Sequence, residues 1–260
     1  MDPQDPAKDA GAPRFNAERQ ATILAMLRSH GRVEVLELAR MLQVSEHTVR
    51  RDLLALQGQG ALQRTHGGAV SLDTSRLDLA ARSAAMPAAK AAIGRAAASL
   101  VMPGQSLILD AGSTTLALAR ALSVRPLTVI TNSMAIAQVF AQDAQVQLAL
   151  TGGTWQAGPQ ALWGPAAEAM LDHCRADWAV PGACALDAVQ GVTAIDEADA
   201  SLKRKMISRA RHTLILGDQS KQDGVAPFLV ADWTQVHTLV TNRAWPELAA
   251  RGVEVLLAQG

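Results

Sequence analysis

The sequence predicts an α/β protein in which a small, mainly helical N-terminal unit precedes a larger parallel α/β domain. Two observations lead to this prediction. Up to about residue 70, apolar residues recur at the three- and four-residue spacing of amphipathic helices. From residue 90 onward, short apolar strands alternate with helical segments, which is typical of a parallel sheet covered on both faces. Because 49% of the 260 residues are apolar, both parts can bury a core.

The N-terminus and the cysteines indicate the compartment. Residues 1–13 are rich in Pro, Asp and Ala and lack an apolar run, so we expect a disordered tail and no signal peptide. No apolar stretch reaches the ~20 residues that a membrane helix needs. The two cysteines, Cys174 and Cys184, fit neither a metal site nor a disulfide framework, and we expect them in a core or a pocket wall. We therefore expect a cytoplasmic protein without metal, cofactor or membrane contact.

Charge is distributed unevenly along the chain. The formal net charge is zero, which taken alone argues against a nucleic-acid-binding protein. Between Arg14 and Val70, however, eight arginines face five acidic residues, a local excess of three. A modestly basic module attached to a slightly acidic remainder suits specific binding better than purely electrostatic binding.

Three helices are expected in the N-terminal unit, over residues 14–30, 35–42 and 45–57. Ser45 is a good N-cap for the third, because its hydroxyl accepts a hydrogen bond from an amide of the first turn. Val44 and Val49 are placed to form a hydrophobic staple around that cap. Two short helices joined by a tight turn make a helix-turn-helix, although an ordinary packed helix pair has the same spacing.

A β-hairpin is expected next to the third helix. Residues 61–70 alternate weakly and contain a Gly-Gly turn signal. Positive side chains on a helix and on an adjacent wing suit a DNA backbone, because phosphate contacts supply most of the affinity. We therefore predict a winged helix-turn-helix over residues 14–70 that contacts double-stranded DNA. The predicted DNA-binding residues are Ser45, His47, Thr48, Arg50, Arg51, Arg64 and His66.

A polar segment, 71–89, separates this unit from the α/β domain at residues 90–260. We expect the segment to be a linker with some helix, or a dimerisation element. Strands are expected at 106–110, 127–131, 146–150, 178–180, 213–216, 238–240 and 253–256. Helices are expected at 90–100, 116–122, up to Phe140, 166–174 and 203–210.

Four polar loops of small residues point to a ligand site. Open α/β sheets bind ligands beyond the carboxyl ends of their strands, and the loops 110–115, 131–133, 151–153 and 218–221 follow strands. The first runs into a helix N-terminus, whose amides and dipole suit an anion such as phosphate. Any one such loop is as readily a plain strand-to-helix connection. Four at one end of a sheet indicate a small-molecule pocket.

These motifs carry a family resemblance. The run Ser45-Glu46-His47-Thr48-Val49-Arg50-Arg51-Asp52-Leu53, followed by Gly60-Ala61-Leu62 and the run 64–69, resembles the signature of DeoR-type (DeoR/GlpR) bacterial transcription regulators. The second half is similar to the sensor domain of that family at 110–115, 129–133, 151–153, 191–193, 203–207 and 218–221. The resemblance spans residues 14–242. It implies a sensor fold resembling ribose-5-phosphate isomerase.

The resemblance also implies a function. Members of this family commonly repress carbohydrate-metabolism operons, and a phosphorylated sugar or related metabolite relieves their operator binding. The implied effector-binding residues are Asp110, Gly112, Ser113, Thr114, Thr115, Asn132, Gly152, Gly153, Lys203 and Lys221. Trp155-Gln156 stands where the family often has Tyr-Arg, which leaves a less charged effector open. We expect a homo-oligomer on repeated half-sites, because a single winged module rarely reaches useful specificity.

A competing interpretation is an enzyme, a sugar-phosphate isomerase or transferase fused to a DNA-binding module. Its proton-transfer groups would come from Asp110, Asp196, Glu197, Lys203 and Lys221. We expect no enzymatic activity, because similarity of fold does not transfer function. The sequence leaves open whether the protein represses or activates transcription.

Overall fold

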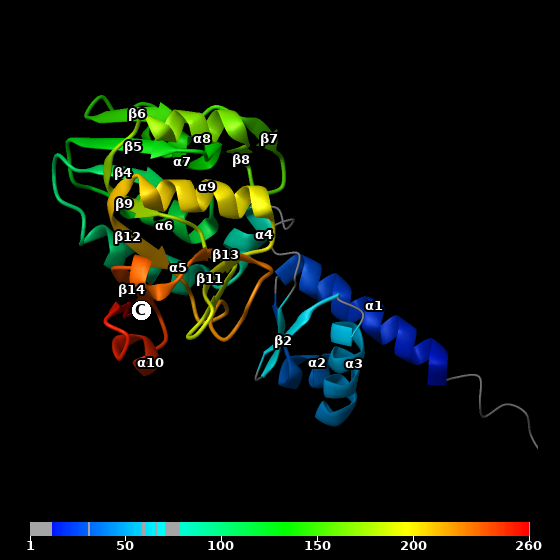
Figure 1. Ribbon diagram of the computed structural model, residues 1–260. Coiled ribbons are helices and arrows are strands. Elements are labelled where there is room, and N and C mark those ends of the chain that lie inside the picture. Colours follow the sequence, from blue (N-terminus) through cyan, green and yellow to red (C-terminus); the bar gives the residue numbers. More distant parts are fainter. Residues whose placement is uncertain (1–11, 31, 59–60, 66, 71–78, 260) are drawn as a thin grey trace, which may run out of the picture. The chain divides into compact units, whose positions relative to one another are not determined.

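The computed structural model describes residues 12–30, 32–58, 61–65, 67–70 and 79–259 (Figure 1). The chain forms two compact units, Met1–Thr74 and Ser75–Gly260. Residues 1–11 of the expected tail and the predicted DNA-binding residue His66 lie outside the described residues. None of the described helices is long and apolar enough to cross a membrane.

The first unit contains three helices and a small antiparallel sheet. Its elements are α1 (Ala12–His30), β1 (Arg32–Glu34), α2 (Val35–Met41), α3 (Glu46–Gly58), β2 (Gln63–Thr65) and β3 (Gly68–Val70). The predicted helices and hairpin are confirmed. Strand β1 was not predicted; it pairs with β3, so the wing has three strands in the order β1-β3-β2. Gly68 allows this pairing, because a Cβ there would lie 1.9 Å from the carbonyl oxygen of Val33.

One core and one ion pair hold the first unit together. The core consists of fully buried apolar side chains from all three helices and the wing, including Ile23, Leu38, Leu53 and Leu62, with Val49 buried and Val44 packed against them. Across this core, the Arg19 guanidinium on α1 makes two hydrogen bonds to the Asp52 carboxylate on α3. Because Asp52 is buried, this pair fixes how α1 lies on α3.

A seven-stranded sheet forms the centre of the second unit (Figure 1). In sheet order its strands are β15 (Glu254–Leu257), β14 (Thr238–Thr241), β12 (Ala210–Leu216), β9 (Ala176–Val180), β4 (Ser106–Leu109), β5 (Leu127–Thr131) and β6 (Val146–Leu150). Every neighbouring pair is parallel. All seven strands expected from the sequence are therefore confirmed, together with the parallel sheet.

Helices cover both faces of this sheet. One face packs against α5 (Pro87–Ala98), α6 (Ser113–Ala121) and α7 (Met134–Phe140), through side chains such as Ile93, Leu118 and Phe140. The other face packs against α8 (Pro165–Asp172) and α9 (Glu197–Ser208). The remaining helices are α4 (Leu79–Ala84), α10 (Pro246–Ala249) and a 3-10 turn, Trp233–Gln235. The alternation of apolar strands with helices predicted this layering correctly.

Three helices of the second unit, α5, α6 and α9, begin three or more residues earlier than expected, and α6 begins at Ser113 where residue 116 was predicted. Pro87 opens α5 at its first turn, where a proline loses no helical hydrogen bond, and does not end the linker as predicted. Helix α9 begins six residues before the predicted Lys203, because the Asp196 side chain caps it by accepting from the amides of Ala198 and Asp199.

Five short strands were not predicted. Strands β7 (Thr154–Gln156) and β8 (Ala161–Trp163) form a hairpin, and β10 (Ala185–Asp187), β11 (Gly191–Ala194) and β13 (Phe228–Ala231) form a small antiparallel sheet. Three or four residues are too few to establish a two-residue period.

Candidate DNA-contact surface and ligand pocket

Helix α3 is built as a capped amphipathic helix. The Ser45 hydroxyl accepts a hydrogen bond from the Thr48 amide at 3.2 Å, which satisfies one of the free donors of the first turn. Val49, Leu53 and Leu56 are buried at helical spacing. The opposite face of α3 is therefore held toward solvent by the core.

The predicted DNA-binding residues lie on this face and on the wing. Ser45, His47, Arg50 and Arg51 are exposed, and Thr48 is half-buried. Arg64 lies on β2 and is also half-buried.

Arg50 and Arg51 differ in their surroundings. The Arg50 guanidinium forms an ion pair with Glu46 one turn earlier, at 2.9 Å, with both side chains exposed. No residue in the described part of the chain pairs with the Arg51 guanidinium. Arg51 is thus the freer of the two cations to meet a phosphate.

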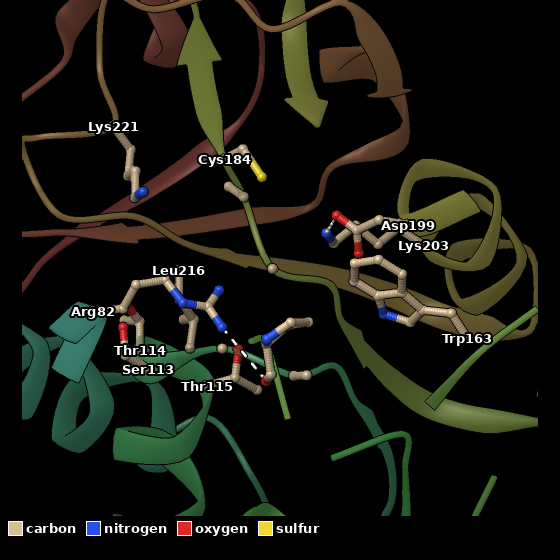
Figure 2. Close-up of a pocket in the computed structure, with 15 residues that line it drawn as sticks. Arg82, Ser113, Thr114, Thr115, Trp163, Cys184, Asp199, Lys203, Leu216 and Lys221 are labelled. Atoms are coloured by element: carbon tan, nitrogen blue, oxygen red, sulfur yellow. Dashed lines mark hydrogen bonds and ion pairs between the residues drawn. The ribbon is translucent and has the colours of Figure 1, made fainter. Parts of the chain in front are cut away.

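A pocket opens at the carboxyl ends of β4, β9 and β12 in the second unit (Figure 2). The space between its lining residues, open solvent at the mouth included, is about 630 Å³. Its lining comes from α4, the α6 N-terminus, the β7–β8 hairpin, the loop after β9, α9 and the loop after β12. The lining residues are Arg82, Ala111, Gly112, Ser113, Thr114, Thr115, Pro159, Trp163, Gly182, Ala183, Cys184, Asp199, Lys203, Leu216 and Lys221.

Positive charge gathers where α6 begins. Gly112 stands at the N-cap and provides no side-chain cap, so amides of the first turn and the helix dipole face the pocket. The Lys221 ammonium has no hydrogen bond or ion pair to any described residue. The Arg82 guanidinium reaches the Pro159 carbonyl at 3.5 Å (Figure 2). This end of the pocket is suited to an anion.

Lys203 also lines the pocket, but two carboxylates compensate its charge. The side chain is buried; its ammonium forms an ion pair with Asp199 and lies 3.6 Å from Oδ2 of Asp110. Burial disfavours the charged ammonium, yet the two carboxylates outweigh it and raise the pKa of Lys203. Lys203 is therefore held as a cation within an internal ion-pair cluster, and Lys221 is the lining lysine without a partner among the described residues.

Asp110 and Asn132, predicted to contact the effector, are not among the lining residues. Asp110 Oδ2 accepts from the Gly182 amide at 2.8 Å, and Oδ1 accepts from the Ala111 amide at 2.8 Å and the Asn132 side chain at 3.0 Å. The carboxylate thus joins the ends of β4, β5 and β9. Both side chains support the pocket from behind.

Gly152 and Gly153, also predicted to contact the effector, do not line the pocket. Gly153 has a φ of +123°, and a Cβ there would lie 2.5 Å from the carbonyl oxygen of Trp163. Its glycine permits the tight entry into the β7–β8 hairpin. The sequence signal at 151–153 therefore marks the hairpin that carries Trp163 into the pocket.

Several lining residues were not predicted. Asp199 could have been found, because an acid four residues before Lys203 on a helix lies on the same face. Arg82 lies in a segment interpreted as a linker, and nothing in the sequence marks it. Cys184 lines the pocket and Cys174 packs against the core, as expected for a wall thiol and a core thiol. The described residues contain no group of three side chains that could hold a metal ion.

Comparisons with known proteins identify both units. A model of the DeoR-like helix-turn-helix domain matches residues 19–75, and a model of the DeoR C terminal sensor domain matches residues 86–243. The chain is 33% identical over 252 residues to the HTH-type transcriptional repressor GlcR of Bacillus subtilis, covering 94% of this chain and 97% of that protein. It is 32% identical over 231 residues to the L-fucose operon activator of Haemophilus influenzae, covering 88% and 93%.

The same comparisons include solved structures. Ribose 5-phosphate isomerase A from Methanocaldococcus jannaschii matches at 18% identity with a TM-score of 0.37, over 51% of this chain and 53% of that chain. Translation initiation factor eIF-2B from Pyrococcus horikoshii matches at 12% identity with a TM-score of 0.44, over 88% of both chains. On the two domain matches and the full-length relatives, the chain belongs to the DeoR family of helix-turn-helix transcriptional regulators.

Proposed function

We propose that this protein is a repressor of a carbohydrate-metabolism operon, and that a phosphorylated sugar or related metabolite in the pocket releases it from its operator. Several relatives are named as repressors, among them GlcR and a putative aga operon repressor of Escherichia coli O157:H7, the latter 31% identical over 251 residues. Another relative is named as an activator. Operator position relative to the promoter decides between the two outcomes.

The observation that carries the effector class is the Lys221 ammonium, which lines the pocket without a hydrogen bond or ion pair to any described residue. Lys221 and Arg82 line the same pocket as the open N-terminus of α6, while Lys203 is already neutralised by Asp110 and Asp199. An anion at this end gains charge-assisted hydrogen bonds. A phosphate group on a small polar metabolite fits that end better than a neutral sugar does.

The exposed face of α3 is the proposed reading surface. Arg50 and Arg51 would contact DNA phosphates or base edges, with Arg64 on the wing reaching the neighbouring backbone. A single unit of this size makes few contacts, so a homo-oligomer on repeated half-sites is part of the proposal.

Helix α4 offers a route from pocket to DNA. It is the first described element after the wing, and it is held to the sensor unit by the Leu79 amide on the Gly158 carbonyl at 3.0 Å and by Arg82 on Pro159. An anion that binds Arg82 in the pocket would therefore act directly on α4, the first described element of the sensor unit. An effector that binds more tightly to a conformation with weak operator affinity shifts the protein toward that conformation. It lowers operator affinity by at most the ratio of its own affinities for the two conformations.

The pocket favours a sensor over the isomerase alternative. Of the five acid–base residues considered for catalysis, only Lys203 and Lys221 line the pocket. Asp196 caps α9, and Glu197 pairs with Arg204 on the helix surface. We propose that the protein is not an enzyme.

The test is a fluorescence-anisotropy titration with DNA from upstream of its own gene and the adjacent operon, at fixed salt, with and without sugar phosphates and free sugars. We expect selective binding that one phosphorylated compound relieves. Arg50→Ala and Arg51→Ala should each weaken operator binding about tenfold, because each removes a phosphate contact. Each should also reduce the slope of log affinity against log salt concentration by about one.

Arg120→Ala is the matched control, because Arg120 is exposed on α6 in the sensor unit. It should leave operator affinity unchanged. Wild-type affinity in both α3 variants would place the DNA-contact surface elsewhere, and turnover of ribose 5-phosphate would restore the enzyme interpretation.

A further inference from the structure

One side of the ligand pocket holds a donor and an acceptor that no described residue satisfies. The donor is the indole N–H of Trp163, whose Nε1 atom is buried and has no acceptor among the described residues. The acceptor is Oδ1 of Asp199: its other oxygen, Oδ2, binds Lys203, and no described group donates to Oδ1. Both residues line the pocket.

The two groups lie together and apart from the anion-binding end. In Figure 2, Trp163 is on the same side of the pocket as the Asp199–Lys203 pair, and Arg82 lies on the other side with Ser113 and Thr114. Helix α9, which carries Asp199, packs against strand β8, which carries Trp163. A ligand anchored at α6 by an anion would extend toward Trp163.

The indole is fixed in place by its surroundings. Trp163 packs against the apolar cluster of Ala167 and Leu202, and its backbone pairs with Thr154 in the β7–β8 hairpin. Gly153 lies close against the Trp163 backbone, because a Cβ at Gly153 would stand only 2.5 Å from the Trp163 carbonyl oxygen. A donor held this firmly is suited to selecting one ligand geometry.

The chemistry of the pair identifies the group it would bind. A buried N–H without a partner costs free energy, which a ligand oxygen would recover. A hydroxyl both accepts and donates, so it can take the Trp163 proton and give its own to Asp199. A carbonyl oxygen or an unprotonated phosphate oxygen can only accept, and it would leave Asp199 Oδ1 without a donor.

We propose that Trp163 determines effector specificity, by donating its indole N–H to a ligand hydroxyl that in turn donates to Asp199. The inference rests on the proposed effector pocket and narrows its ligand to a hydroxylated phosphate ester. Inorganic phosphate fills only the anion end, and a deoxy analogue loses the group that Trp163 reads.

The test compares the wild type with Trp163→Phe, which removes the N–H and keeps an aromatic ring. Trp155→Phe is the matched control, because Trp155 is 46% exposed on the partner strand β7 and does not line the pocket. The probes are inorganic phosphate, ribose 5-phosphate, glucose 6-phosphate and glycerol 3-phosphate, each with its dephosphorylated form. Calorimetry gives the affinities, and singly deoxygenated analogues of the tightest ester complete a double-mutant cycle.

We expect Trp163→Phe to bind the tightest ester about tenfold more weakly, while inorganic phosphate binds both proteins equally and Trp155→Phe behaves as wild type. Removing the hydroxyl that Trp163 binds should lower the ligand affinity of the wild type about tenfold. The same removal should lower the affinity of Trp163→Phe only slightly. Equal ester affinity in Trp163→Phe, or an equal loss for inorganic phosphate, would overturn the inference.

If Trp163→Phe fails to fold, the deoxygenated analogues can still be tested on the wild type. If none of them binds more weakly than the parent ester, the wild-type protein does not recognise a ligand hydroxyl and the inference is refuted. If inorganic phosphate and the esters bind but the deoxygenated analogues bind equally well, the role of Trp163 is refuted while the anion-binding pocket is supported. If no probe binds the wild type, the proposed effector pocket falls with it.

Discussion

Lys90 is a buried cation behind the anion end of the pocket. Its ammonium donates to the carbonyl oxygens of Arg82 and Ala85, the latter at 2.6 Å. Burial lowers the pKa of Lys90 to about 8, with Lys221 and Arg82 acting in the same direction against Asp218. Lys90 therefore loses its proton slightly above neutral pH, and the positive potential at the pocket falls with it.

We expect inorganic phosphate to bind several-fold more weakly as the pH rises from 7 to 9. Calorimetric titration across that range measures this change, and Lys90→Met should lack it. Inorganic phosphate gains negative charge at the lower end of this range, which would strengthen its binding, so its own titration does not mimic the effect. A pH dependence that persists in Lys90→Met would assign the titration to another group.

The lowered pKa of Lys90 also makes the free energy of unfolding depend on pH. The pKa of Lys90 is about 8 in the folded state, against an ordinary value of 10.5. Between these values the unfolded chain binds more protons than the folded one, so the free energy of unfolding rises with pH. The contribution is fully present above about pH 10.5 and is lost as the pH falls through about 8.

Residue roles were harder to predict than residue positions. The small, hydroxyl-bearing loop at 112–115 was recognisable, because strand-to-helix turns at sheet ends follow known chemistry. Asp110 follows the same strand end, yet its carboxylate holds backbone amides, and only coordinates distinguish these roles. Trp163 reaches the pocket through a short hairpin whose pairing no local pattern specifies.

At the scale of elements, long apolar strands were predictable and short connecting pieces were not. Strands of the main sheet are buried on both faces, so they appear as apolar runs. Helix α4 has six residues, below the length at which periodicity identifies a helix, and it was assigned to a linker. That assignment hid Arg82 from the predicted site.

Helix α4 should separate ligand binding from ligand response. We expect Lys221→Ala and Thr114→Val to weaken sugar-phosphate binding while operator affinity without ligand stays unchanged. At saturating ligand both should still release operator fully, because they alter only affinity. Arg82→Gln should release operator incompletely even at saturation, because Arg82 joins the ligand to α4.

Anisotropy at saturating sugar phosphate measures this difference. Lys205→Ala is the matched lysine control, because Lys205 pairs with Asp172 outside the pocket lining. Full release by Arg82→Gln would place the coupling in another element.

At the scale of the whole molecule, the two units have separate hydrophobic cores. We expect Asp52→Asn to destabilise the DNA-binding unit by about 2–3 kcal/mol, because it leaves Arg19 without its buried partner. Differential scanning calorimetry should show an earlier transition for that unit and an unchanged one for the sensor unit.

Asp172→Asn, at a surface ion pair with Lys205, is the control, and it should leave both transitions nearly unchanged because exposed ion pairs contribute little to stability. A joint shift of both transitions in Asp52→Asn would mean that the units unfold as one.

Separate cores also bear on how such regulators diverge. When a gene of this kind is duplicated, a change at Arg51, the proposed DNA contact, would alter which promoter one copy controls without disturbing the packing around Trp163, and the reverse would hold. New pairings of nutrient and promoter can therefore arise one substitution at a time, with no intermediate that has lost its fold.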